Sequence, residues 1–219
     1  YDKEHDHLIV FNDLLPNGKS FFTSFITNNE FNKEATRFLL DHGADPNKPD
    51  SNGILPLEAA INLDLIDVAL ELIDSDKIDF KQKIIIKSSE EKDQSNPKYT
   101  TYLHLAAQFS REILEEILNK NVIDVNATND FGDTPLIEAC RKKNKKNVMI
   151  LFESDFCGNS QLDFLHKNNN GEDAIHTVNP NANTKLITDK DEYLEKLLSY
   201  LSKNSINKDC ISDDDHGDD

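Results

Sequence analysis

Apolar side chains recur along the chain at spacings that suit short helices packed in pairs. Near the end of the chain four leucines fall at i, i+3, i+4 and i+7 and form one apolar stripe, which predicts a helix over residues 186–204. Earlier segments each carry two adjacent large apolar residues of the kind that a buried helix face needs. These pairs are Leu39-Leu40, Leu72-Ile73, Ile117-Leu118 and Leu151-Phe152.

A second pattern repeats in a nearly fixed register. Large apolar residues stand in equivalent positions at spacings of 35, 46, 33 and 39, namely Phe22, Leu57, Leu103, Leu136 and Ile175. Two of them lie in similar stretches, Thr101-Tyr-Leu-His-Leu-Ala-Ala107 and Thr134-Pro-Leu-Ile-Glu-Ala-Cys140. A threonine before a helix can cap it, and proline suits the first helical position because no donor is lost there. The pattern predicts tandem helix–turn–helix units.

This motif and its period resemble the ankyrin-repeat family, in which a 33-residue repeat opens on Thr-Pro-Leu-His. The resemblance covers roughly residues 17–200 and implies an all-α ankyrin-repeat solenoid of about five helix-turn-helix repeats, with β-hairpin fingers and a C-terminal capping helix. The first and fifth units match less well, with Ser20-Phe-Phe-Thr23 and Asp173-Ala-Ile-His176 in the motif position. Terminal repeats are expected to be atypical because they cap the stack.

The register also divides the chain. Residues 1–16 form an N-terminal cap segment, which suits a helix or a strand. The repeats occupy residues 17–185, and the final helix is followed by an acidic disordered tail at 205–219. An insertion at 81–98 separates the second repeat from the third, and we expect a mobile loop there rather than a dedicated binding device. The repeat boundaries are 17–49, 50–80, 99–128, 129–167 and 168–185.

Charge and composition narrow the class of partner and the location. The chain has 41 acidic and 24 basic residues and a formal net charge of −17, which disfavours nucleic acid and anionic membranes as partners. No apolar run approaches a membrane span, and three cysteines without paired spacing fit a reducing compartment. We therefore expect a cytoplasmic monomer without membrane insertion. Abundant Asn, Lys, Ile and Asp suggest an effector of an intracellular bacterium, secreted into the host-cell cytosol.

The sequence contains no convincing catalytic or metal-binding constellation. In ankyrin repeats the histidine of the motif, here His104, resembles a structural residue that links adjacent hairpins. Cys157 and His166 could be imagined as a nucleophilic pair, but no protease signature surrounds them. His5 and His7 are too few for a structural zinc site, which normally has four protein ligands. We predict a protein that is not an enzyme, with no catalytic residue, cofactor or metal.

The resemblance implies that a partner meets the hairpin tips and the outward positions of the first helices, which line a concave face. The tips are acidic and rich in amides, so we expect a basic or polar protein partner. Phe131 places an apolar ring at a tip, either as a binding anchor or folded onto the next finger. The expected partner-binding residues are Ser51, Asn52, Ile54, Asn62, Gln108, Phe109, Asp130, Phe131, Asp133, Arg141, Asn169 and Asn170.

Two further features of the sequence suggest a modification site and a role for its basic cluster. Asn47 and Asn126 each follow a leucine by eight residues and an acidic residue by two, which resembles the sites that a host asparaginyl hydroxylase uses on ankyrin proteins. The run Arg141-Lys-Lys-Asn-Lys-Lys146 could bind an acidic partner or act as a nuclear address. We favour a solvated turn that moderates the acidity of the chain.

The sequence as a whole predicts a non-catalytic protein–protein interaction module that binds a host or cellular protein through its hairpin tips and concave face. The chain begins at Tyr1 and its only methionine is Met149, so we expect it to be a piece of something longer. The alternative is therefore the substrate-recognition part of a larger multidomain enzyme whose catalytic domain lies outside this chain.

Overall fold

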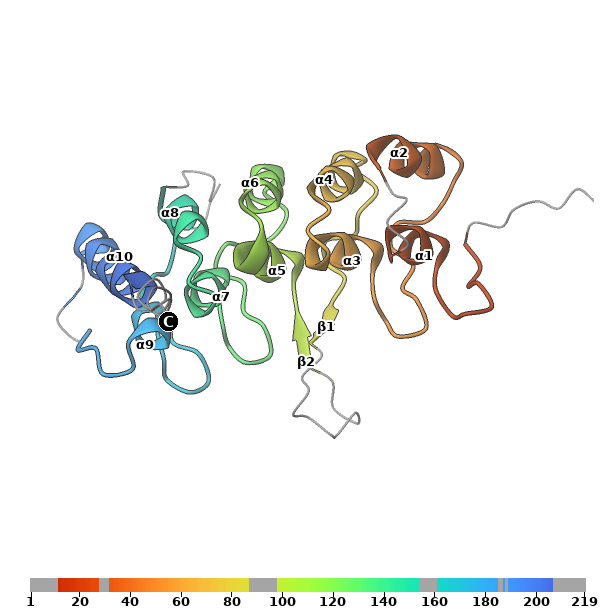
Figure 1. The fold of residues 1–219 in the computed structure, drawn as a ribbon. Coiled ribbons are helices and arrows are strands. Elements are labelled where there is room, and N and C mark those ends of the chain that lie inside the picture. The colour runs from red at the N-terminus through yellow and green to blue at the C-terminus, as the bar shows by residue number, and fades with distance from the viewer. Residues whose placement is uncertain are drawn as a thin grey trace, which may run out of the picture.

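The computed structural model describes residues 12–27, 32–86, 98–153, 161–184, 187 and 189–206. In this part of the chain helices follow one another in pairs and stack into an elongated array (Figure 1). The first helices of the pairs lie in one row, and they are α1 (Phe21–Thr27), α3 (Pro56–Asn62), α5 (Tyr102–Phe109), α7 (Pro135–Arg141) and α9 (Ala174–Val178). The second helices lie in the other row, and they are α2 (Lys33–Asp41), α4 (Ile66–Asp74), α6 (Arg111–Lys120), α8 (Lys145–Glu153) and α10 (Lys190–Ile206).

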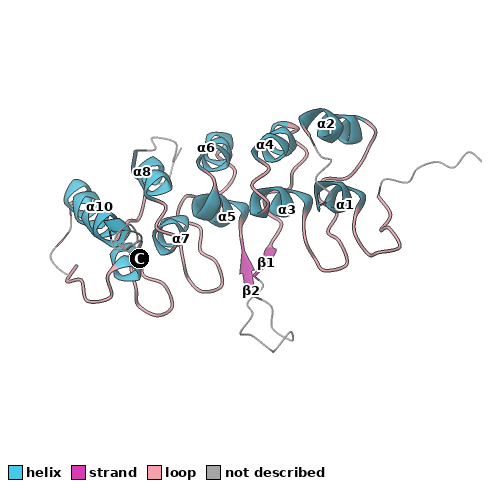
Figure 2. Ribbon diagram, viewed as in Figure 1, coloured by secondary structure: helices cyan, strands magenta, loops and turns pink. Residues whose placement is uncertain are grey.

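The loops that precede the first helices project from one side of the array and form its fingers (Figure 2). One pair of strands is found among the described residues, β1 (Ile84–Ile86) and β2 (Lys98–Thr100), which are antiparallel with Ile84 opposite Thr100. The strands flank residues 87–97, so the part of the insertion that we expected to be mobile lies outside the described residues. The prediction for that part stays a prediction.

Local residues explain where α7 begins and where α2 ends. The Thr134 hydroxyl accepts from the Ile137 amide at 3.4 Å, and Pro135 is the first residue of α7, as the sequence predicted. At the end of α2, Gly43 has φ +85° and lets the Ala44 amide donate to the Leu39 carbonyl at 3.0 Å. Glycine is favoured in this left-handed position because it has no Cβ.

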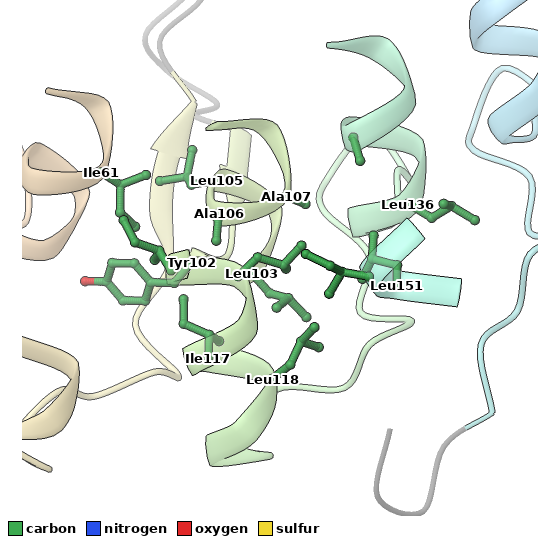
Figure 3. Close-up of a cluster of buried hydrophobic side chains, with 14 of the residues drawn as sticks. Ile61, Tyr102, Leu103, Leu105, Ala106, Ala107, Ile117, Leu118, Leu136 and Leu151 are labelled. Atoms are coloured by element: carbon green, nitrogen blue, oxygen red, sulfur yellow. The ribbon is translucent and has the colours of Figure 1, made fainter. Parts of the chain in front are cut away.

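The core runs continuously between the two rows of helices (Figure 3). Leu103 is fully buried at the centre of the cluster, and Ala106 and Ala107 beside it are small enough for neighbouring helices to approach closely. Each unit buries its apolar face against the next one, which is the arrangement of a repeat stack. Replacing a fully buried leucine of this kind with alanine typically costs about 2–5 kcal/mol of stability.

Helix α10 covers the end of the stack and runs antiparallel to α8. At its start the Lys190 ammonium donates to the Phe152 carbonyl at the end of α8, with 2.7 Å between the atoms. Near its other end Ser202 contacts Lys145, the first residue of α8, at 3.3 Å. The buried edge of α10 is Tyr193, Leu197 and Leu201, whereas the predicted stripe began at Leu194, which is only partly buried.

Candidate functional site

The fingers are tied to one another by main-chain hydrogen bonds. The Ser51 amide donates to the Gly18 carbonyl at 2.7 Å, and the Asp130 amide donates to the Tyr99 carbonyl at 3.0 Å. The Asn169 amide donates to the Phe131 carbonyl at 3.0 Å, which joins the fourth finger to the fifth. These bonds align the tips of three pairs of adjacent fingers along one edge of the molecule.

A side-chain oxygen fixes the shape of each of three finger turns. In the fourth unit, Asn129 Oδ1 accepts from the amides of Phe131 and Asp133 at 2.9 and 3.0 Å. The same pattern places Asp50 under the second finger and Asn168 under the fifth. Turns of this kind need no paired strands, because the side chain takes the role of a main-chain acceptor.

Most of the predicted tip residues lie on the surface. Ser51, Asn52, Asp130, Asn169 and Asn170 are exposed, whereas Ile54 and Phe131 are partly buried. No described residue bonds to the side-chain amide of Asn52 or Asn170, so both amides can donate and accept freely. The structure therefore presents an edge of polar groups held on rigid turns.

Asp133 is a correction to the predicted set, because its side chain is only 1% exposed. Both of its carboxylate oxygens accept from the Arg141 guanidinium, at 2.7 and 2.9 Å, and Asn168 donates to one of them at 2.8 Å. Arg141 also contacts Glu138 at 3.0 Å. A buried charge is costly unless it is paired and hydrogen-bonded, so Asp133 stabilises the fold. It also takes up much of the hydrogen-bonding capacity of Arg141.

His104 joins the third unit to the fourth. Its Nε2 lies 2.8 Å from the Asp133 carbonyl, and its Nδ1 lies 2.9 Å from the Thr101 hydroxyl. A carbonyl only accepts, so Nε2 carries the proton and Nδ1 accepts from Thr101. Burial lowers the pKa of His104 to about 4 and keeps the ring neutral. The structural role that the resemblance implied for this histidine is confirmed.

The ends of the first helices form a second exposed line beside the tips. Leu63 follows α3 and is 51% exposed, and Phe109 ends α5 and is 46% exposed. Each stands eight residues after the residue that directly precedes its helix, Leu55 or Thr101, so the two occupy the same register position in consecutive units. The predicted residue Asn62 is exposed beside Leu63, and Gln108 is partly buried beside Phe109.

Leu63 was missed by the sequence analysis, although counting the register from Leu55 would have found it. In the fourth unit the same position holds Lys142, whose ammonium lies 5.4 Å from the centre of the Phe109 ring. This line therefore changes from apolar to basic as it passes from the second unit to the fourth. We call Asn62, Leu63, Gln108, Phe109 and Lys142 the helix-end line.

The two asparagines proposed for hydroxylation hold neighbouring units together. The Asn47 side chain donates from Nδ2 to the Lys77 carbonyl at 2.7 Å, and its Oδ1 accepts from the Asp79 main-chain amide at 2.8 Å. Asn126 makes the equivalent pair of bonds to the main chain of the next unit, at Gln161 and Asp163. Their modification stays a prediction, and each side chain would have to leave two bonds to reach an enzyme.

The described residues offer little that suggests chemistry. Cys157, His5 and His7 lie outside them, and His166 Nε2 is 2.9 Å from the Gly132 carbonyl, where it links two fingers. Burial raises the pKa of the Cys140 thiol, which is fully buried. In the described ranges no three His, Cys, Asp or Glu side chains are grouped to hold a metal ion. No helix there has the length and apolar character needed to cross a membrane.

Comparisons with known proteins agree with this geometry. Residues 80–162 match the family described as ankyrin repeats in three copies. Neurogenic locus notch homolog protein 1 of Xenopus tropicalis is 32% identical over 122 residues, which is 55% of this chain. The matched region spans only 4% of that relative's length.

Two solved structures share the fold. One belongs to a complex of a predatory endopeptidase from Bdellovibrio bacteriovorus with an immunity protein, with a TM-score of 0.63 and 22% identity, covering 90% of this chain and 86% of that one. The other is the ankyrin repeat domain of Bcl-3, a member of the IκB protein family, with a TM-score of 0.60 and 16% identity. It covers 88% of this chain and 73% of that one. The expected repeat solenoid is confirmed.

Proposed function

Because this chain is an ankyrin-repeat protein, we propose that it is a non-catalytic module that binds a protein through its helix-end line and finger tips. Ankyrin repeats are generally protein–protein interaction modules, and repeat stacks use extended faces for this purpose. The proposal assigns the interaction to one such face of this chain.

The observation that supports the proposal is that an exposed apolar residue recurs at the same position of two consecutive repeats. Single exposed apolar side chains are normal on protein surfaces, so the exposure of Leu63 or Phe109 alone would decide nothing. Their equivalent positions in consecutive units place them along one line of the stack, where one extended partner segment can cover both. Burying such side chains yields about 25 cal/mol per Å² of apolar area, and aromatic residues are enriched among binding hot spots.

The two lines suggest the chemistry of the partner. An apolar side chain of the partner would cover Leu63 and Phe109. Main-chain or polar side-chain groups of the partner would form hydrogen bonds with the side-chain amides of Asn52 and Asn170 at the tips. Asp130 adds an exposed carboxylate to the finger tips, which supports the expectation of a basic or polar partner on that side. We propose further that this partner is a host protein.

The test replaces both apolar residues of the helix-end line. A Leu63→Ser/Phe109→Ser variant and the unchanged chain are used to capture partners from cell lysate, and the captured proteins are quantified by mass spectrometry. The affinity of each specifically enriched protein is then measured with purified components. We expect the variant to bind the true partner at least about tenfold more weakly, which corresponds to about 1.4 kcal/mol.

A matched control separates this line from general surface stickiness. Phe38 and Val122 are 55% and 50% exposed and lie on second helices or just after one, away from the helix-end line. A Phe38→Ser/Val122→Ser variant removes a similar apolar surface and should keep full affinity. If both variants bind equally well, or the control loses as much affinity as the test variant, the helix-end line is not the binding face.

A further inference from the structure

The turn between α7 and α8 gathers four lysines, Lys142, Lys143, Lys145 and Lys146, which we call the basic turn. All four are exposed, and none forms an ion pair with a carboxylate of the described residues. Arg111, Lys120 and Arg141, in contrast, are each paired with an acidic side chain. In a chain of net charge −17, an unneutralised basic cluster attracts acidic segments.

The C-terminal end of helix α10 lies near this turn. Because α10 runs antiparallel to α8, its last turns pass the start of α8, where Lys145 Nζ contacts Ser202 at 3.3 Å. The helix ends at Ile206, which is about 6 Å further along its axis at 1.5 Å per residue. The last turn of α10 therefore lies beside the basic turn.

Those residues are strongly acidic. Between 207 and 219 the sequence has six aspartates, at 209, 213, 214, 215, 218 and 219, and one basic residue, Lys208. Thirteen residues span up to about 43 Å when extended, so the acidic groups can reach all four lysines. A short tether also keeps the local concentration of the tail in the millimolar range.

We propose that this acidic tail, residues 207–219, docks on the basic turn of its own chain and covers the adjacent edge of the helix-end line. Lys142 connects the two surfaces, because its ammonium lies over the Phe109 ring. A protein that binds Phe109 then has to displace the tail, so the tail acts as a competing ligand within the chain. This inference goes beyond the proposed function, and docking is measured without any partner.

Salt sensitivity is part of the proposal. An exposed ion pair contributes only about 0–1 kcal/mol, so docking depends on several pairs acting together under the tether. Salt screens charges over a Debye length of about 10 Å at 0.1 M and about 3 Å at 1 M. Docking should therefore weaken steeply as the salt concentration rises.

Cys210 provides a natural position for a probe within the tail. A Cys157→Ser variant of the whole chain leaves Cys140, which is fully buried, and Cys210. A nitroxide spin label attached to Cys210 should broaden the amide NMR signals of Phe109 and of residues 142–146 at low salt. In about 0.5 M salt, at which charges are screened over a few ångströms, the broadening should fall to the level that the tether alone produces.

Two charge variants decide whether the lysines are the docking site. Lys142→Glu/Lys143→Glu/Lys146→Glu keeps Lys145, which contacts Ser202, and at low salt should reduce the broadening to its high-salt level. Lys48→Glu/Lys81→Glu/Lys167→Glu makes the same change in net charge elsewhere and should leave it unchanged. The proposal is overturned if the first variant keeps the full low-salt broadening, or if the broadening in the chain with unchanged lysines does not depend on salt.

A mixed sample identifies the copy that supplies the tail. Chains that carry the spin label but no ¹⁵N are mixed with ¹⁵N-labelled chains that carry no spin label. Broadening in the mixed sample would show that the tail of a second copy occupies the turn, which contradicts docking within one chain. We expect none, and this result does not depend on whether the helix-end line binds a partner.

Discussion

His104 makes the stability of the stack sensitive to acid, because a single buried ring joins two units. Its pKa is about 4 in the folded chain against an ordinary value of 6.5. The unfolded chain thus binds more protons between these values, and stability falls as the pH drops from 6.5 towards 4. The full difference is about 3 kcal/mol at 1.36 kcal/mol per pKa unit.

The measurement is the free energy of unfolding in urea at a series of pH values. His104→Gln should lose stability at neutral pH and show a shallower decline with acid than the unchanged chain. His42→Gln changes an exposed histidine and should leave the decline as it is. An unchanged slope in His104→Gln would show that other groups account for the acid sensitivity.

Asp133 is predicted to be the most costly of the originally proposed site residues to replace. Alanine at this position leaves the Arg141 guanidinium and the Asn168 amide without their shared acceptor. Removing one partner of a buried pair costs about 3–5 kcal/mol, and because the Arg141 side chain is 41% exposed we expect about 2–3 kcal/mol. Urea denaturation measures this loss.

Asn170→Ala is the matched control for Asp133→Ala, because Asn170 sits on a neighbouring finger with an exposed side chain. Surface changes of this kind usually alter stability by less than about 0.5 kcal/mol. Comparable losses in the two variants would mean that the ion pair of Asp133 contributes no more to folding than a solvated tip does.

At the scale of single elements, local chemistry made the helix starts and the repeat register predictable. Thr134 caps α7 and Pro135 is its first residue, as expected, because both roles depend only on neighbouring residues. The edge of α10 was predicted less well, since the leucine stripe suggested Leu194. Tyr193 is buried instead because its hydroxyl finds partners 18 and 20 residues away, the Ile175 amide at 3.1 Å and the Asp173 carboxylate at 3.2 Å.

The candidate site shows the same limit. Phe109 and the tip amides follow from the register alone, and the structure places them on the surface. Asp133 occupies an equally tip-like position in the sequence, yet Arg141 and Asn168, eight and 35 residues away, draw it into the interior. Partners that are distant in sequence decide which polar residues are free, so no local pattern could separate Asp133 from Asp130.

For the molecule as a whole, the links between units are unevenly distributed. Units one and two share the Arg37–Glu71 ion pair at 2.7 Å and the Asn47 bridge. Units three and four share the His104 bond, the Asn126 bridge and bonds from Asn147 to main-chain carbonyls of α5. Polar groups thus reinforce the apolar packing at both of these junctions.

The junction between units two and three has fewer such links in the described part of the chain. Lys81 holds the register position of Asn47 and Asn126. By sequence, Pro97 holds the position of Ser51 and Asp130, and proline has no N–H to donate. The contacts there include apolar packing, with Phe80 edge-on to Tyr102 at 6.0 Å, and an ion pair between Lys120 and the exposed Asp76.

We therefore predict that the first two units open more readily than the rest of the stack. Stability in a repeat stack is a sum of unit and interface contributions, so a weak interface allows one block to unfold while the other remains folded. Native-state hydrogen exchange across a urea series should give lower opening free energies for amides of α3 and α4 than for those of α5 and α7. Equal values in both blocks would show one cooperative unit.

A Lys81→Asn variant tests the cause of this weakness rather than its presence. The main-chain amide of Lys81 donates to Asp79 Oδ1 at 3.0 Å, as the main-chain amide of Asn47 does to Asp45 Oδ1. The turn that would position an asparagine side chain at residue 81 is therefore already in place. Each hydrogen bond that the new side chain makes to the third unit should add about 0.5–1.5 kcal/mol. The gain should appear in the opening free energies of α3 and α4 and leave those of α7 unchanged, because the third unit and those beyond it already hold together without the bridge. A gain spread evenly over all helices, or none in α3 and α4, would place the weak point elsewhere in the stack.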